Sequence, residues 1–271
     1  MHLRTPEKGS KKIAGCRIST ILCSPCLEPW AKSGRVSGRH KKPTHMANEN
    51  EKEAAARASL RFLRDGQIVG LGTGSTAAYA VRLIGERVRA GLKIRGIPTS
   101  VQTKELATSL RIPLTTLKEF QQIDVTIDGA DEVDPQVRVI KGGGGALLRE
   151  KVIASASRQL VIIADSSKQV AMLGKFPLPV EIIPFAEPLV AKRIAGLGAT
   201  VKLRQSADGK PFITDEGHHI LDCSFGKIPD PPALARQLSD MPGVVEHGMF
   251  IGMASVALIA KGNAIEELHR K

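Results

Sequence analysis

The sequence predicts an α/β fold: a Rossmann-like parallel sheet with helices on both faces plus an inserted ferredoxin-like (βαββαβ) α+β subdomain. Two observations favour it. Apolar strands and amphipathic helices alternate up to about residue 177, and a different order of elements follows until an apolar strand returns near residue 256. We therefore expect a basic extension at 1–45, a Rossmann-like catalytic domain at 46–177 with 250–271, and the subdomain at 178–249.

The first part of the chain alternates strand and helix, which is typical of a parallel sheet covered by helices. Residue periods of two and of 3.6 distinguish the two kinds of element. The expected strands of this one sheet are 67–71, 92–97, 124–127, 137–140 and 160–164. The expected helices are 51–63, 75–89, 99–110 and 146–157.

After Pro177 the pattern becomes βαββαβ, the order of a ferredoxin-like unit. Its expected strands are 180–183, 200–203, 220–224 and 243–247, and its expected helices are 188–197 and 232–239. The apolar run 256–260 then predicts a strand that returns to the first sheet, so the unit is interpreted as an insertion.

The net charge of +12 is concentrated in the first 45 residues, which hold ten Lys/Arg against two acidic residues. The rest of the chain carries 29 basic and 25 acidic groups, without the aromatic and basic interleaving that stacks bases. No apolar run approaches the ~20 residues that span a bilayer. Beyond residue 45 the chain has a single cysteine, Cys223, so no disulfide framework can form there. We expect a soluble, cytoplasmic protein that binds neither nucleic acid nor a membrane.

The segment 1–45 lacks periodicity, and we expect it to be mostly disordered. Its Cys16, Cys23 and Cys26 allow a zinc site as an alternative, although no second cysteine pair follows at finger spacing. Its basic, acid-poor composition also fits a transit peptide. A third alternative is that translation starts at Met46, because a helical pattern begins directly after it.

The segment Gly70-Leu-Gly-Thr-Gly-Ser-Thr76 joins an expected strand to an expected helix. Backbone N–H groups and the positive end of the helix dipole would meet there, as a phosphate requires. A dinucleotide fingerprint does not fit, because Ser75 holds the place of its third glycine and no acidic residue ends the next strand. No Gly-Lys-Ser/Thr follows as in a Walker loop. A single phosphate is therefore favoured over a mere strand–helix turn.

Carboxylates and a lysine occur at two further points. Asp128, Asp131, Glu132 and Asp134 follow an apolar strand, so we expect them in a loop at its carboxyl end, where open α/β sheets bind ligands. Lys141 ends another expected strand and is followed by four glycines, which let the backbone approach a ligand closely. The next helix carries Glu150, and a further strand end carries Lys168.

His218 and His219 are neighbours on an expected strand, so they face opposite sides and cannot chelate one metal. No other His/Asp/Glu cluster of the body has ligand spacing. We expect a site with no metal and no cofactor.

Together these segments resemble ribose-5-phosphate isomerase, type A. The resemblance rests on 72–76, 128–131, 141–144, 149–151 and 174–181, and it covers about 52–259. It implies that Glu150 is the proton acceptor and that the protein forms a dimer or tetramer. A weaker match places Lys52 near phosphate. The implied substrate-binding residues are Thr73, Gly74, Ser75, Thr76, Asp128, Gly129, Ala130, Asp131, Lys141, Gly142, Gly143, Gly144 and Lys168.

The chemistry of such an aldose-ketose isomerase suits these residues. One carboxylate, Glu150, can remove and return the proton next to a carbonyl, while Lys141 and nearby N–H groups stabilise the enediolate oxygen. Asp128 or Asp131 would shuttle hydroxyl protons during ring opening. Two alternatives stay open: another sugar-phosphate isomerase or deaminase, and a non-catalytic sugar-phosphate sensor. The sensor is ranked last, because it leaves Lys141 and Glu150 without a task.

Overall fold

The computed structural model describes residues 43–270, and the statements below concern these residues. Its largest sheet has six strands in the order β13-β12-β6-β3-β1-β2. Strands β12, β6, β3, β1 and β2 run parallel to their neighbours, and β13 runs antiparallel to β12. The expected return of a late strand to this sheet is confirmed, because β12 pairs with β6. The strands are β1 (Ile68–Leu71), β2 (Arg95–Pro98), β3 (Ile123–Gly129), β6 (Ser157–Asp165), β12 (Val256–Lys261) and β13 (Ala264–His269).

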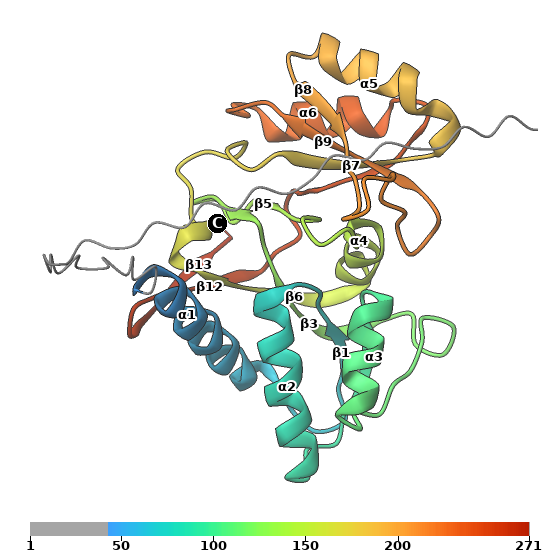
Figure 1. Ribbon diagram of the computed structural model, residues 1–271. Coiled ribbons are helices and arrows are strands. Elements are labelled where there is room, and N and C mark those ends of the chain that lie inside the picture. Colours follow the sequence, from blue (N-terminus) through green and yellow to red (C-terminus); the bar gives the residue numbers. More distant parts are fainter. Residues whose placement is uncertain (1–42, 271) are drawn as a thin grey trace, which may run out of the picture. The chain divides into compact units, whose positions relative to one another are not determined.

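The central strands are almost continuously apolar because helices cover both faces of the sheet (Figure 1). On one face, a core cluster joins the strands to α1 (Pro43–Ser59), α2 (Ser75–Arg89) and α3 (Val101–Ser109). On the other face lies α4 (Leu147–Ser155), whose Ile153 packs against β1, β2 and β3. α4 also contacts β7 (Leu178–Ile182) and β10 (Val244–His247), so it lies between the six-stranded sheet and a second, four-stranded sheet.

The predicted βαββαβ unit is present. Its antiparallel sheet has the order β10-β7-β9-β8. The first strand of the unit, β7, therefore lies between the fourth strand, β10, and the third strand, β9. The two helices lie beside this sheet (Figure 1) and share one apolar core with its strands. The elements are β7 (Leu178–Ile182), α5 (Glu187–Gly196), β8 (Thr200–Leu203), β9 (His219–Ser224), α6 (Pro231–Ser239) and β10 (Val244–His247). The domain boundaries proposed from the sequence stay a prediction.

The expectation that 137–140 extends the main sheet is wrong. β4 (Glu132–Val133), β5 (Val139–Ile140) and β11 (Met249–Phe250) form a separate sheet of three two-residue strands in the order β11-β5-β4. The turn between β4 and β5 places Val137 at a φ of 58°. A β-branched residue resists this left-handed conformation, so the sequence did not indicate so tight a turn.

The carboxylate segment also differs from the loop that was expected. β3 runs on through Asp128 to Gly129, and Glu132 already belongs to β4. The Glu132 carboxylate accepts hydrogen bonds from Gly174 N (2.7 Å) and Phe176 N (2.6 Å). Glu132 therefore holds the segment that leads into β7 rather than facing a ligand.

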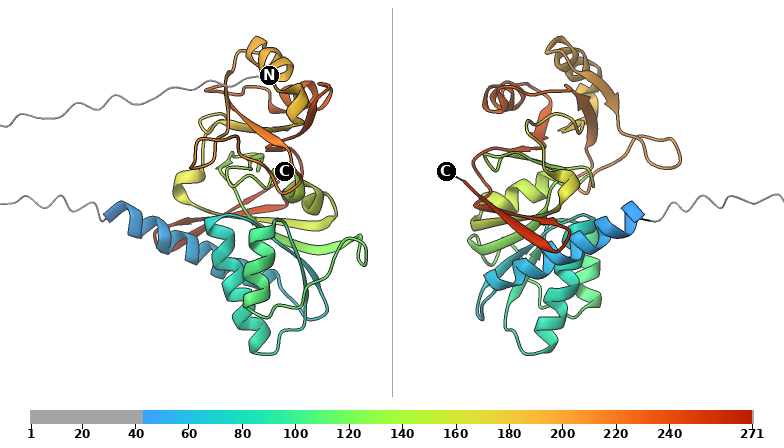
Figure 2. Two further views of the ribbon diagram at one scale, coloured as in Figure 1. Left: turned by 45° about the vertical axis from the view of Figure 1, so that its right-hand side comes forward. Right: turned by 90° about the vertical axis from the view of Figure 1, so that its left-hand side faces the viewer.

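Some element ends were misplaced, and one strand was missed. α1 begins at Pro43, inside the segment expected to be disordered, whereas 1–42 lie outside the described residues. β2 begins at Arg95, three residues later than expected. β13 was missed because its apolar residues are sparse, although the two-residue turn Gly262–Asn263 before it is a hairpin signal. Figure 2 shows the β12–β13 hairpin at the edge of the sheet, beside α1.

The chain also has short 3-10 helices: η1 (Leu60–Phe62), η2 (Ser166–Lys168) and η3 (Pro184–Ala186). None of the helices within 43–270 is long and apolar enough to cross a bilayer.

Candidate active site

The fold brings the predicted site residues together around one small cavity of about 70 Å³. It lies where the turns after β1 and β3 meet the glycine-rich segment before α4. Glu150 lines it together with every predicted substrate-binding residue except Asp128, which is buried next to it. The lining residues are Thr73, Gly74, Ser75, Thr76, Gly129, Ala130, Asp131, Lys141, Gly142, Gly143, Gly144, Glu150 and Lys168.

Lys141 is the centre of the charged groups. Its Nζ lies 2.9 Å from Asp128 Oδ2 and 3.2 Å from Glu150 Oε1, and it donates to the carbonyl of Gly129 at 2.6 Å. All three charged side chains are at least 95% buried. Burial of a lone ammonium would be costly, so the two carboxylates are what allow Lys141 to stay charged here.

The second oxygen of Glu150 is free to act on a ligand. Within the described chain, Glu150 Oε2 is buried and has no hydrogen-bond partner. Burial raises the pKa of Glu150 to about 8 against the opposing effect of Lys141, with the Asp128 charge adding to the rise. Burial alone would lower the pKa of Lys141, but Asp128 and Glu150 outweigh it and raise that pKa. An acid with a pKa near neutrality beside a fixed cation is suited to proton transfer.

Asp128 is fully engaged with protein groups. Its Oδ1 accepts hydrogen bonds from Thr73 N (3.1 Å) and Gly129 N (2.7 Å), and its Oδ2 pairs with Lys141. Burial raises the pKa of Asp128, and the Lys141 ammonium and these N–H groups oppose the rise. Asp128 thus joins the turn after β1 to the lysine. Asp131 lines the cavity itself, and its Oδ2 accepts from Gly143 N at 2.7 Å.

The turn after β1 places a helix start at the cavity. Gly74 has a φ of 110°, a conformation that glycine adopts readily, and α2 begins at Ser75 as predicted. No side chain caps this helix, so its first N–H groups and its dipole remain available. The exposed Ser75 and the buried Thr76 bring hydroxyls to the same point.

The hydroxyl of Thr73 points into a cluster that the sequence did not resolve. Thr73 Oγ1 lies 2.7 Å from Thr99 Oγ1, 2.8 Å from Ser100 Oγ and 3.0 Å from Thr103 Oγ1. Ser100 also caps α3 by accepting from Thr103 N. Thr73 therefore offers the cavity its backbone and methyl side, while its hydroxyl ties the turn to α3.

The glycine-rich segment is fixed by backbone contacts. Lys141 N donates to Gly248 O at 2.8 Å, and Gly145 N donates to Gly142 O at 3.0 Å. Gly142 and Gly145 have φ values of 99° and 83°. A Cβ on Gly142 would lie 2.9 Å from Leu147 Cβ. Both the conformation and the close packing require glycine at this position.

Lys168, at the end of η2, reaches the same cavity. The support for η2 comes from α1, because Glu51 Oε2 accepts from Ser166 N (3.0 Å) and Ser166 Oγ (2.7 Å). Lys52, the weaker match, donates to Glu49 at 2.7 Å and is not among the lining residues.

Phe250 is a site neighbour that the sequence did not single out. Its buried ring lies 5.7 Å from Lys141 Nζ and 5.0 Å from Lys151 Nζ, both within cation–π range. Lys151 also donates to Glu246 Oε1 at 2.6 Å. The triplet 149–151, which as an isolated pattern is typical of a solvated helix face, instead buries Glu150 and most of Lys151.

The two adjacent histidines lie outside the cavity and face different partners. His218 Nδ1 lies 3.0 Å from Glu181 Oε1, and His219 Nδ1 lies 3.0 Å from Glu187 Oε2. Among the described residues there is no group of three or more His, Cys, Asp or Glu that could hold a metal ion.

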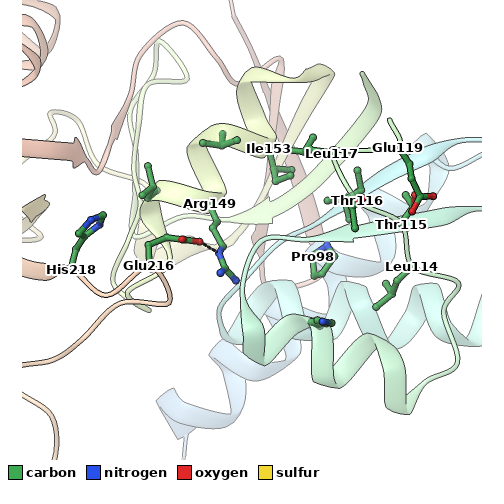
Figure 3. A pocket seen from close by; sticks show the side chains of 14 residues that line it. Pro98, Leu114, Thr115, Thr116, Leu117, Glu119, Arg149, Ile153, Glu216 and His218 are labelled. Carbon is green, nitrogen blue, oxygen red and sulfur yellow. Dashed lines mark hydrogen bonds and ion pairs between the residues drawn. The ribbon is translucent and has the colours of Figure 1, made fainter. Parts of the chain in front are cut away.

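A larger hollow of about 810 Å³ lies on the other side of α4 (Figure 3). It is lined mainly by apolar side chains such as Leu114, Leu117 and Ile153, with Arg149 paired to Glu216 at its wall. It contains none of the buried charges described above. The smaller cavity, on the side of α4 that presents Glu150, is therefore the candidate active site.

Comparison with known proteins places the chain in a family. Residues 95–264 match the family described as ribose 5-phosphate isomerase A (phosphoriboisomerase A). The chain belongs to this family. The ribose-5-phosphate isomerase A of Bradyrhizobium diazoefficiens is 51% identical over 231 residues, which are 82% of this chain and 95% of the relative. That of Agrobacterium fabrum is 55% identical over 214 residues, or 76% and 91% of the two chains.

Solved structures of the ribose 5-phosphate isomerase A family share the fold. A D-ribose-5-phosphate isomerase in complex with phospho-erythronic acid superposes with a TM-score of 0.80 at 38% identity, covering 82% of this chain and 99% of that one. The enzyme of Methanocaldococcus jannaschii gives a TM-score of 0.78 at 38% identity, with the same coverage. The α/β fold with additional antiparallel sheets is thus the fold of this family.

Proposed function

We propose that this family member interconverts D-ribose 5-phosphate and D-ribulose 5-phosphate through an enediolate, in the non-oxidative branch of the pentose phosphate pathway. The observation that carries the proposal is the unpartnered, buried Glu150 Oε2 in a cavity that also presents Lys141 and a helix N-terminus. A base, a cation for a developing oxyanion and a phosphate site are the three parts that this reaction needs.

In the direction from aldose to ketose, the Glu150 carboxylate removes the proton from C2 of the open-chain sugar. The electron pair moves to the carbonyl oxygen at C1, where the Lys141 ammonium and backbone N–H groups stabilise the negative charge. Protonated Glu150 then returns the proton to C1, and the C2 hydroxyl proton passes to the C1 oxygen, which leaves the ketose carbonyl at C2 and a hydroxyl at C1. No atom is gained or lost, so one carboxylate completes the cycle.

The remaining charged residues have supporting roles in this proposal. Asp128 keeps Lys141 charged and aligned, since both its oxygens bind protein groups. Asp131, which lines the cavity, is better placed to move hydroxyl protons during ring opening. The phosphate lies at the start of α2, where Gly74, Ser75 and Thr76 supply donors, with Lys168 beside it.

The test is ketose formation from ribose 5-phosphate by purified protein treated with a metal chelator. An amino-sugar phosphate and arabinose 5-phosphate are run alongside. We expect turnover of ribose 5-phosphate alone, unchanged by chelation. Turnover of the amino-sugar phosphate would favour the deaminase alternative, and binding of ribose 5-phosphate without turnover would favour a sensor.

The proposed quaternary state is a homodimer or homotetramer that associates through the four-stranded subdomain. Large apolar side chains lie exposed around α5, with Phe185 94%, Leu189 49% and Ile183 40% exposed. A patch of this kind often marks a protein interface. The proposed compartment is the cytoplasm, consistent with the free, buried thiol of Cys223.

A further inference from the structure

Arg204, which directly follows β8 in the subdomain, reaches the glycine-rich segment of the active site. Its Nη1 donates to Gly142 O at 2.8 Å and to Gly143 O at 3.3 Å. The same guanidinium forms a two-point pair with Asp222 of β9, through Nε at 3.0 Å and Nη2 at 2.5 Å. The Arg204 side chain is 13% exposed, and its guanidinium also lies over the Phe212 ring, 5.9 Å from the ring centroid.

The Asp222 pair fixes the plane of the guanidinium, because two parallel N–H···O bonds allow only one orientation. The third nitrogen is then presented at a fixed place to two successive carbonyls. Phe212 of the same β8–β9 hairpin packs closely against Gly145 of the glycine-rich segment. A Cβ on Gly145 would lie 2.4 Å from Phe212 Cζ. The hairpin therefore contacts the segment at 142–143 and at 145.

The hairpin is itself anchored to both helices that flank the site. Asp215 Oδ2 accepts from Val101 N, at the start of α3, at 2.8 Å. Arg149 of α4 pairs with Glu216 Oε1 at 2.5 Å and with Asp215 Oδ2 at 3.3 Å, and Figure 3 shows the Arg149–Glu216 pair. Arg149 precedes Glu150 in α4, so the hairpin holds the glycine segment and the proposed base in one frame.

The consequence for the site follows from the geometry of the peptide group, in which C=O and N–H point in opposite directions. The carbonyls of Gly142 and Gly143 point to Arg204, so the N–H groups of Gly143 and Gly144 point away from it. Gly143 N donates to Asp131 Oδ2. Among the hydrogen bonds of the described residues none uses Gly144 N, and Gly144 lines the cavity.

We propose that Arg204, held by Asp222, is a positioning residue that orients the Gly142–Gly144 backbone so that the N–H of Gly144 faces the substrate oxygen. This inference rests on the proposed isomerase function. Glycines have no side chains to fix their conformation, so beyond the turn closed by Gly145 N and Gly142 O the segment depends on contacts supplied from outside it. A lysine could not replace Arg204, because a single ammonium cannot bind a carboxylate at two points and two carbonyls together.

The experiment compares Arg204→Ala and Arg204→Lys with Lys210→Ala as a matched control. The control removes a positive charge from the same hairpin at a side chain that is 81% exposed. Steady-state rates with ribose 5-phosphate, competitive inhibition by inorganic phosphate, and Tm are measured for each. We expect both Arg204 variants to lose ~10- to 100-fold in kcat, as for misplacement of a reacting group by about an ångström, with KM and phosphate inhibition nearly unchanged. Lys210→Ala should match wild type.

Chemical rescue separates positioning from general stability. Millimolar guanidinium should restore part of the kcat of Arg204→Ala by occupying the space beside Asp222, and it should leave Lys210→Ala unaffected. Hydrogen exchange over residues 141–147 should be faster in Arg204→Ala than in wild type. If Arg204→Ala does not fold, Asp222→Asn decides, and it should lower kcat with KM retained.

Three results overturn the inference. One is a kcat for Arg204→Ala within twofold of wild type. Another is a rise in KM and a weakening of phosphate inhibition as large as the fall in kcat. The third is unchanged hydrogen exchange over 141–147. An inactive wild-type protein in the same assay would instead overturn the proposed isomerase function, and the inference with it.

Discussion

Lys141 Nζ lies 3.2 Å from one oxygen of Glu150, while the other oxygen of the same carboxylate is buried without a partner in the described chain. The lysine thus fixes the orientation of the carboxylate without using up its basic capacity. A buried polar atom left unpaired costs ~1–3 kcal/mol. Such a cost is retained where a ligand completes the hydrogen bonding.

Replacement of Glu150 by Gln should abolish the base and keep the shape. The amide oxygen can still accept from Lys141, so the cavity should bind substrate as before. We expect turnover to fall about a thousandfold with little change in KM, because the interaction lost is one made in the transition state. Steady-state kinetics with ribose 5-phosphate measures both constants, and an active Glu150→Gln protein would remove Glu150 from the role of base.

The pH dependence of kcat/KM should show the titration of Glu150. Only its ionised form accepts a proton, and burial raises its pKa to about 8. The logarithm of kcat/KM should therefore rise with pH up to about 8 and then level off. The second ionisation of a phosphate ester, near pH ~6, lies below this limb. The residual activity of Glu150→Gln should not show this rise with pH. If the rise persisted in this variant, it would belong to the titration of another group.

The same pKa shift predicts that the base lowers stability. In the unfolded chain Glu150 titrates near its ordinary pKa of 4.5, and in the folded protein near 8. Below pH 4.5 the group is protonated in both states and has no effect. As the pH rises between these two values, Glu150 loses its proton in the unfolded state before it does so in the folded state. The free energy of unfolding of the wild type therefore falls over this pH range. Above the folded pKa the penalty is constant.

Glu150→Gln does not titrate, so its Tm advantage over wild type should grow between pH 5 and pH 8. We expect a difference of several degrees, since ~1 kcal/mol shifts the Tm of a chain of this size by about 2–4 °C. Calorimetry at both pH values measures it. Glu105→Gln, an exposed change on α3, serves as the matched control. An advantage that is equal at both pH values would contradict the prediction.

The exposed apolar residues of the subdomain should be sites of association. Phe185→Asp places a charge at a position that is 94% exposed, so it should not disturb the core of the subunit. We expect it to reduce the mass in solution from dimer or tetramer to a smaller species, as measured by light scattering. Ile213→Asp, 54% exposed but on the β8–β9 hairpin, is the control that should leave the mass unchanged. A Phe185→Asp protein of wild-type mass would place the interface elsewhere.

The sequence identified the residues of the cavity because they follow strands or begin helices, where local pattern is informative. Ser75 starts α2 as predicted, and Lys141 and Glu150 flank the glycines as the motif implied. The contacts that hold the site were beyond local pattern. Arg204 lies more than 60 residues from the carbonyls it binds, and its place depends on the packing of a subdomain against a loop.

The same distinction explains the errors in the fold. The strands of the main sheet were predicted where they are long and apolar, as for β6 and β12. The three-stranded sheet was not, because two-residue strands such as β5 carry no period, and only their pairing with β4 and β11 defines them. The hydroxyl cluster at Thr73 was missed in the same way, since Thr103 joins it from the first turn of another helix.

Gly72 should be as necessary for the charged pair as the charged residues are. A Cβ at this position would lie 2.3 Å from Asp128 Oδ1 and 2.6 Å from Asp128 Cα, so Asp128 and its strand would have to move. We expect Gly72→Ala to lower stability by about 1–3 kcal/mol, as overpacking does. It should also lower kcat, because Asp128 aligns Lys141. Denaturant unfolding and kinetics are measured together with Gly196→Ala, whose Cβ would meet nothing within 4 Å. A Gly72→Ala protein with wild-type stability and rate would show that Asp128 does not need its present position.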